Sequence, residues 1–116
     1  MRLIRDNALL FLLTALVVIL TACPQHVSIG DLNSNPARYA GKEVSVAGKV
    51  TSSFGLLGAG AFQVDDGTGK IWVLSENYGV PSKGVKVGVT GRVTEGATVA
   101  GRSFAVALRQ TQKPHY

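Results

Sequence analysis

The chain has 116 residues, a formal net charge of +5 at pH 7 and a single cysteine. This length fits one small domain with one modest core. The single cysteine excludes an internal disulfide, so stability has to come from packing and sheet hydrogen bonds. The basic residues form no run, so charge alone does not indicate a nucleic-acid-binding patch.

The N-terminal segment has the layout of a secretory signal peptide. Arg2 and Arg5 supply positive charge ahead of an apolar run over residues 8–20. Two small residues then lead directly into Cys23. An uncleaved membrane anchor is the alternative, but a spanning helix needs about 20 apolar residues and this run is shorter.

The residues Leu20-Thr21-Ala22-Cys23 resemble the lipobox of bacterial lipoproteins. The resemblance implies that the Cys23 sulfur is acylated, for example with palmitate, and that the chain is cut just before it. It therefore implies a lipid-anchored protein on the exported side of a bacterial membrane, and it leaves inner and outer membrane open. A buried structural cysteine is the alternative for Cys23.

These features divide the chain into four parts. Residues 1–22 form the signal peptide, and residues 23–27 form the lipidated N-terminus and a short tether. The folded domain is expected over residues 28–110, followed by a C-terminal tail over 111–116.

A short helical turn is predicted at the start of the domain. Asn35 suits the cap, Pro36 suits the first helical position and Gly41 suits the left-handed exit. Ile29 and Leu32 are expected to pack this segment on the core.

Alternating β-branched and polar residues predict five strands after this turn. In order, their apolar positions are Val44, Val46 and Val50; Phe62 and Val64; Ile71 and Val73; Val85, Val87 and Val89; and Phe104, Val106 and Leu108. The sequence Asp66-Gly67-Thr68-Gly69 predicts a tight turn between the second and third strands. The glycine-rich residues 55–60 are expected to form a mobile loop between the first and second strands.

Residues 41–52 and 84–95 form a short internal repeat in which Gly48 corresponds to Gly91. A glycine inside a strand usually marks a bulge or a sharp bend. Two bent strands at equivalent places favour a sheet that curls into a small closed barrel.

The order of these elements resembles an OB-fold over residues 28–110. The stretch Phe62 to Val73 is similar to the second and third strands of anticodon-binding OB domains. The resemblance implies an all-β fold, a five-stranded barrel preceded by the signal peptide and the helical turn. One departure is the segment 76–84, where Gly79 and Pro81 leave no room for the helix that many OB domains place after the third strand.

No catalytic or metal-binding constellation is recognised, so we expect no enzyme activity, cofactor or metal. Asp65 and Asp66 are better explained as turn residues, and His26 and His115 lie near the chain ends without partners at ligand spacing. Glu76-Asn77-Tyr78 faintly resembles the haem-attachment segment of a periplasmic haem chaperone. That segment needs a preceding histidine, and Ser75 stands there instead. We therefore do not expect a haem chaperone.

Trp72 is the most informative side chain for binding. If Ile71 and Val73 face the barrel interior, Lys70 and Trp72 point outward on the third strand, the usual ligand side of OB domains. The candidate ligand face is Trp72, Lys70, Gln63, Lys49 and Arg92. In the alternative interpretation Trp72 covers a small auxiliary core and contacts Ile29 or Leu32.

The sequence thus predicts a non-catalytic, lipid-anchored OB-fold module of the bacterial envelope that binds a protein, peptide or glycan. The alternative is a protein that binds single-stranded nucleic acid.

Overall fold

The computed structural model describes residues 24–56, 59–99 and 101–116. In chain order its elements are β1 (Gln25–His26), α2 (Ile29–Ser34), α3 (Pro36–Tyr39), β2 (Glu43–Leu56), β3 (Ala59–Asp65), β4 (Lys70–Ser75), β5 (Lys86–Val99) and β6 (Arg102–Gln110). The expected signal peptide and Cys23 lie outside the described residues. Within them, no helix is both long enough and apolar enough to span a bilayer.

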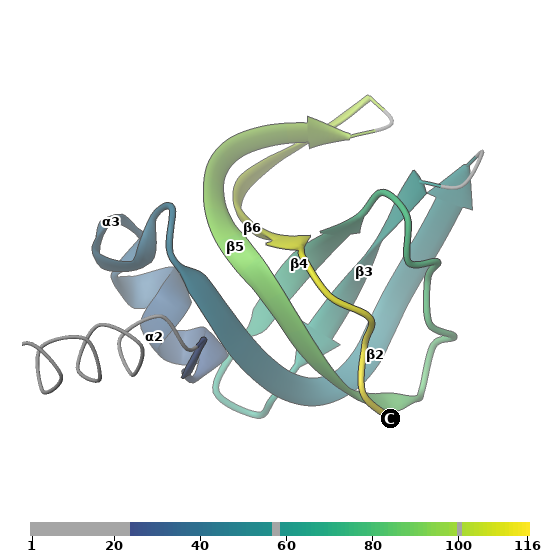
Figure 1. Ribbon diagram of the computed structural model, residues 1–116, viewed down its shortest axis with the longest axis horizontal. Coiled ribbons are helices and arrows are strands. Elements are labelled where there is room, and N and C mark those ends of the chain that lie inside the picture. Colours follow the sequence, from purple (N-terminus) through teal and green to yellow (C-terminus); the bar gives the residue numbers. More distant parts are fainter. Residues whose placement is uncertain (1–23, 57–58, 100) are drawn as a thin grey trace, which may run out of the picture.

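The sheet closes on itself, as the sequence predicts. The strands are hydrogen-bonded in the order β1-β2-β3-β4-β6-β5, and β2 also pairs with β5. The pairing of β2 with β5 joins the two ends of a five-stranded ring, and β1 adds to it by a short parallel pairing with β2. Figure 1 shows β5 and β6 curving together beyond the barrel, while β2 and β3 extend away as a second hairpin.

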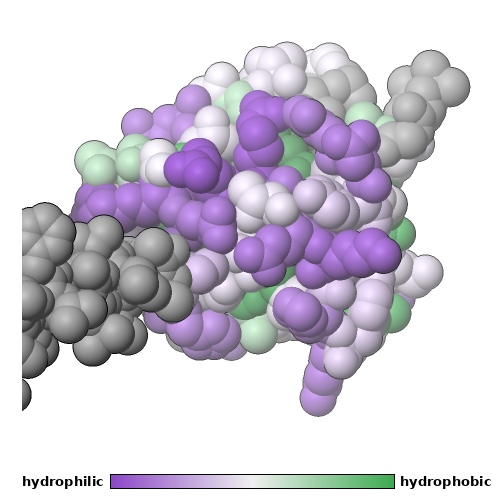
Figure 2. Space-filling model, in the orientation of Figure 1, coloured by the Kyte–Doolittle hydropathy of each residue, from purple (hydrophilic) through white to green (hydrophobic). Residues whose placement is uncertain are grey.

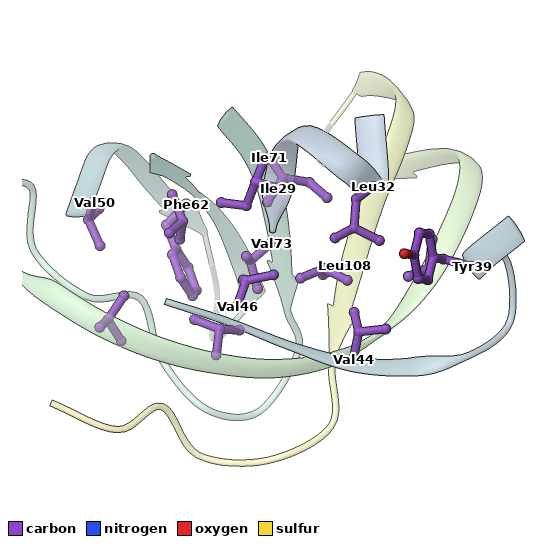
Figure 3. Packing of buried hydrophobic residues seen from close by; sticks show 14 residues of the cluster. Ile29, Leu32, Tyr39, Val44, Val46, Val50, Phe62, Ile71, Val73 and Leu108 are labelled. Atoms are coloured by element: carbon purple, nitrogen blue, oxygen red, sulfur yellow. The ribbon is translucent and has the colours of Figure 1, made fainter. Parts of the chain in front are cut away.

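Most of the barrel interior is filled by residues that alternation predicted, but not all of the predicted positions lie there. Val85 is half-buried outside the core, Val106 packs at the edge of the core, and Phe104 belongs to a second cluster. The core comprises Ile29, Leu32, Tyr39, Val44, Val46, Val50, Phe62, Val64, Ile71, Val73, Val87, Val89, Val93 and Leu108. Figure 3 shows Leu32 and Tyr39 at one end of this cluster and Val50 and Phe62 toward the other. Two helices and five strands therefore pack on one core. Such close packing makes the barrel rigid, so residues on its outer face are held in fixed positions.

The N-terminal region contains one helix more than the sequence predicts. Ser28 caps α2 by accepting a hydrogen bond from the Asp31 N–H, and Ile29 and Leu32 are fully buried on the core as expected. The predicted turn is confirmed as α3, with Pro36 in its first turn. The Asn35 side chain makes no cap hydrogen bond to α3, and the Asn35 backbone N–H donates to the Asp31 carbonyl at the end of α2.

Both ends of the domain lie along the sheet. Gln25 pairs with Val44, and the Val27 N–H donates to the Ser45 carbonyl at 3.0 Å. Ordered structure therefore begins before Ser28, within the segment expected as a tether. At the other end, Thr111 and the residues that follow it continue alongside β5.

The expected loop over residues 55–60 is instead the end of a β-hairpin. Strand β2 continues to Leu56 and β3 begins at Ala59, with Gly55 opposite Gly60. Here the strand pairing outweighs the low strand propensity of glycine. The segment after β4 carries no helix, in line with the expectation, and Val80 and the buried Pro81 pack there instead.

Gly48 and Gly91 lie at positions where the neighbouring backbone leaves no room for a side chain. An ideal Cβ on Gly48 would lie 2.3 Å from the Asp65 carbonyl oxygen, and one on Gly91 would lie 2.8 Å from the Arg109 carbonyl oxygen. Neither glycine has a positive φ. The neighbouring backbone approaches both sites because β2 and β5 each pair with two strands as the barrel closes.

Replacing Gly48 by alanine should therefore lower the free energy of unfolding by about 1–3 kcal/mol, the usual cost of forcing extra volume into a packed site. Gly88→Ala is the matched control, because its Cβ would meet only His115 atoms at 3.7–3.8 Å. Urea denaturation of both variants measures the difference. Equal midpoints for the two variants would refute the close-approach explanation.

Candidate functional site

Three aromatic side chains form a row on the outside of the barrel. Trp72 of β4 lies between Phe54 of β2, at 5.8 Å between ring centroids, and Phe104 of β6, at 5.4 Å. Interplanar angles of 58° and 48° show tilted packing, a favourable geometry for aromatic pairs. This aromatic row connects the β2–β3 hairpin to the β5–β6 hairpin across β4.

The aromatic row belongs to a second apolar cluster, separate from the barrel core. Its buried members are Ala61, Leu74, Ala97, Phe104 and Ala107, with Phe54 and Trp72 packed against them. Ile29 and Leu32, the contacts proposed for a core tryptophan, belong to the barrel core instead. Trp72 is thus half-buried on the outer face, beside a shallow hollow of about 480 Å³ that Asn33, Phe104 and Val106 also line.

Four charged residues form a second row across the same side of the barrel. Lys86 of β5 is directly opposite Lys49 of β2, Lys49 is opposite Asp65 of β3, and Asp65 is opposite Lys70 of β4. All three lysines are exposed. We call these four residues, Lys86, Lys49, Asp65 and Lys70, the lysine row. Strands lie about 4.8 Å apart, so the row spans roughly 15 Å.

The lysines of this row have no ion-pair partner among the described residues, where the salt bridge found joins Arg109 to Glu76. The carboxylate of Asp65 instead accepts a hydrogen bond from the Gly67 N–H at 2.9 Å. The row therefore presents an excess of positive charge to solvent.

The two rows are neighbours. Trp72 follows Lys70 by two residues on β4, so both side chains are on one face, and Gln63 is directly opposite Trp72 on β3. Two residues along a strand correspond to about 7 Å. Gln63 is held by the Thr51 hydroxyl, which donates to its Oε1 at 3.0 Å.

Four of the five candidate ligand residues are thus brought together, and Arg92 is not. Arg92 lies on β5 opposite Glu43 and Arg109, away from both rows. Its Nη1 donates to the Gly41 carbonyl at 2.8 Å. This contact gives Arg92 a role in holding the segment that follows α3.

Sequence reasoning missed Phe54, Phe104 and Lys86 as members of this face. Phe54 falls in residues 51–60, where serines and glycines hide the strand pattern. Lys86 becomes part of the row only through the pairing of β5 with β2. The hydrophilic residues in Figure 2 are spread over the whole viewed surface, so no single patch marks the site.

Asp65 and Asp66 are turn residues, as predicted. The Asp66 carboxylate accepts hydrogen bonds from Thr68 and Gly69 within the turn and from the Ile29 N–H of α2 at 2.9 Å. Partial burial raises the pKa of Asp66, but these hydrogen bonds outweigh burial and leave the pKa below its ordinary value of 3.8. Asp66 thereby fastens the start of α2 to the β3–β4 turn.

The described residues contain no group of three or more His, Cys, Asp or Glu side chains placed to hold a metal. His26 is exposed on β1. His115 exchanges two backbone hydrogen bonds with Gly88.

Solved structures identify the architecture. An OBody bound to hen egg-white lysozyme is 22% identical, with a TM-score of 0.50 over 65% of this chain and 81% of its own. Asparaginyl-tRNA synthetase from Pyrococcus horikoshii is 18% identical, with a TM-score of 0.53 over 67% of this chain but 20% of its own. The protein assigned as an aspartyl-tRNA synthetase in Leishmania major Friedlin is 15% identical, with a TM-score of 0.59 over 79% of this chain and 20% of its own.

The domain is an OB-fold. No protein-family model and no curated protein matches the sequence. At these identities the structural matches establish the fold alone, because one fold serves many functions. This chain corresponds to about a fifth of each synthetase.

Acidification should release the contact between Asp66 and α2. Because its pKa is lowered in the folded state, ionised Asp66 stabilises the fold above about pH 4, and this contribution is lost as the pH falls through the folded pKa. Asp66→Asn should therefore cost about 1 kcal/mol at pH 7 and lose less stability than the parent on acidification.

Asp65→Asn is the control, since the Asp65 carboxylate accepts one hydrogen bond, from the N–H of Gly67 two residues further along the same turn. Thermal melts between pH 7 and pH 2.5 measure both variants. Parallel stability curves for the parent and Asp66→Asn would contradict the role assigned to Asp66.

Proposed function

We propose that this domain is a non-enzymatic module that binds single-stranded nucleic acid across β4, β3 and β2. The observation that carries the proposal is the position of the aromatic row directly beside the lysine row. Bases stack on exposed aromatic faces, and lysines neutralise the phosphates that follow them. Similarity to two synthetases whose names specify tRNA as substrate supports the same class of ligand.

Each row has a distinct part in this proposal. Trp72 offers a ring that its neighbours hold in place, so stacking on it costs little side-chain entropy. Lys70 lies two residues before Trp72 on β4, and Lys49 lies on β2 opposite Asp65. Both lysines supply positive charge beside the ring. Stacking on an aromatic ring and neutralisation of phosphates do not depend on which base is bound, so we expect weak sequence preference and strong salt dependence.

A protein, peptide or glycan of the cell envelope is the second candidate ligand. The observation that favours it is the apolar and neutral lining of the hollow beside Trp72, formed by Asn33, Ser103, Phe104, Ala105 and Val106 among others. An OBody, which shares the fold, binds hen egg-white lysozyme. A partner of this kind would pack on Trp72 and leave the lysine row largely uncovered.

Titration with a short oligothymidine at several salt concentrations separates the two candidates. Trp72 is the single tryptophan, so its fluorescence reports binding directly. On a logarithmic plot of affinity against salt, each phosphate contact on a single strand contributes a slope of about −0.7. Lys49→Gln and Lys70→Gln should each remove about one such contribution. Trp72→Leu lacks the fluorophore and is therefore measured by calorimetry, where it should weaken binding by about 1–3 kcal/mol.

Lys42→Gln is the matched control, because Lys42 is exposed but precedes β2 and lies outside the lysine row. It removes the same charge and should keep the parent salt slope apart from a small general effect. Absence of oligonucleotide binding, or an equal loss for all three lysine variants, would overturn the proposed site.

We also propose that Cys23 carries a lipid that tethers the domain to the outside of a bacterial membrane. The support is the lipobox-like sequence at the end of the apolar run. Since Gln25 already pairs with Val44, such an anchor would hold the barrel close to the bilayer. With such an anchor, the ligand of either class would have to be one that is present outside the cytoplasm.

Cys23→Ser should abolish acylation and cleavage at this position. Intact-mass measurement of the protein from bacterial membranes tests this directly. Stable attachment needs more than one acyl chain, because a single chain binds membranes only marginally. A wild-type protein that keeps residues 1–22 and carries no acyl mass would refute the anchor.

A further inference from the structure

The edge of β6 that faces β4 is only partly paired. Strand β4 starts at Lys70, and its pairing with β6 covers residues 107–109. Among the described residues, the earlier part of β6, residues 102–106, is paired with β5 alone. The sheet therefore has an open edge along the first half of β6, in line with the start of β4.

Backbone groups on this open edge point away from β5. The Val93 N–H donates to the Lys42 carbonyl at 2.9 Å, so the backbone of Val93 is turned away from Leu108, its partner on β6. Antiparallel pairs without mutual hydrogen bonds recur at every second residue. The pairs that contain Phe104 and Val106 are therefore of the same type. These two residues present backbone N–H groups about 7 Å apart along the open edge.

The hollow beside Trp72 follows this open edge. Its volume is about 480 Å³, and its lining residues are Ser103, Phe104, Ala105 and Val106 of β6, Trp72 of β4 and Asn33 of α2. Asn33 is fixed at the start of β4, because its Nδ2 donates to the Lys70 carbonyl at 2.9 Å. The hollow thus borders four consecutive residues of β6, a length of about 13 Å.

The chemistry of the hollow matches an extended peptide. Every side chain that lines it is neutral, so no lining group attracts a phosphate by charge. Proteins usually protect a strand edge with charged side chains, proline or a covering element, whereas Ser103 and Ala105 on this edge are small and exposed. An extended peptide repeats its own N–H and C=O groups about every 7 Å, the spacing of the open edge. The Trp72 ring offers an apolar wall to one of its side chains.

We propose that an extended peptide segment of a partner protein adds to the sheet here as a strand beside β6, with one apolar side chain against Trp72. In strand addition of this kind, backbone hydrogen bonds supply affinity and the contacts of alternate side chains supply specificity. The proposal develops the second candidate ligand and does not depend on the lysine row. The recognised unit is a neutral segment of about four residues, the length of the open edge.

The probe is a hexapeptide of alternating threonine and valine with both ends blocked, because both residues favour strands. NMR titration of the isotope-labelled protein with millimolar peptide should shift the amide signals of Phe104 and Val106 and slow their exchange with solvent. Two further peptides carry N-methyl groups on alternate amides, one peptide for each set. Methylation of one set should weaken binding about tenfold or more, because the hydrogen bonds to β6 are lost. Methylation of the other set, which faces solvent, should be tolerated.

Ala105→Lys tests where the peptide binds. Ala105 is exposed and lines the hollow, and a charged side chain on a strand edge hinders the addition of another strand. This variant should keep the parent melting temperature and lose the peptide-induced shifts at Phe104 and Val106. Thr98→Lys is the matched control, because Thr98 is exposed on β5 of the same hairpin but does not line the hollow. It should bind the peptide as the parent does.

The outcomes separate this site from the proposed nucleic-acid face. Ala105→Lys and Thr98→Lys add the same charge, so they should bind oligothymidine equally, whether that binding is present or absent. Equal losses from both methylated peptides, or unchanged signals at Phe104 and Val106 with the unmodified peptide, would overturn strand addition by a peptide. A protein that sediments as a dimer and becomes monomeric on Ala105→Lys would make a second copy the occupant, which would also overturn the proposal.

Discussion

Strand β2 changes its pairing partner from β5 to β3 at Gly48 and Lys49, and this change sets the shape of the domain and of its outer face. Over its first half β2 pairs with β5, and over its second half it pairs with β3. At the change of partner the Asp65 carbonyl comes so close to Gly48 that a side chain does not fit. The next residue, Lys49, is the point where the two pairings meet, opposite both Asp65 and Lys86.

The lysine row is therefore a product of barrel closure. Lys49, Lys70 and Lys86 are far apart in the sequence, and no charge run marks them. They become neighbours because three separate registers place them opposite one another or opposite Asp65. A shift of one residue in any of these pairings would turn the affected side chains to the other face of the sheet. The electrostatics of the face thus depend on the same packing that stabilises the core.

The sequence predicted what depends on local pattern. Alternation located the barrel core, including Val46, Val64 and Val73, and turn chemistry located the hairpin at Asp66. It could not predict what depends on distant partners. Phe54 and Phe104 lie at strand ends that only hairpin pairing reveals. Arg92 lies away from both rows and donates to the carbonyl of Gly41, which is 51 residues away in the sequence, so the local pattern could not indicate this contact.

Trp72 is neither a residue of the barrel core nor an isolated surface residue, the two alternatives that the sequence offered. Alternation on β4 turns it away from the barrel interior, so it is free of the main core. Phe54 and Phe104 then pack against it in tilted geometry and link the two hairpins through β4. A ring held in this way is rigid before any ligand arrives, and rigid aromatic surface binds at low entropic cost. The proposed binding surface therefore coincides with the cluster that links the hairpins. A substitution at Trp72 has to be judged by folding and binding measured together.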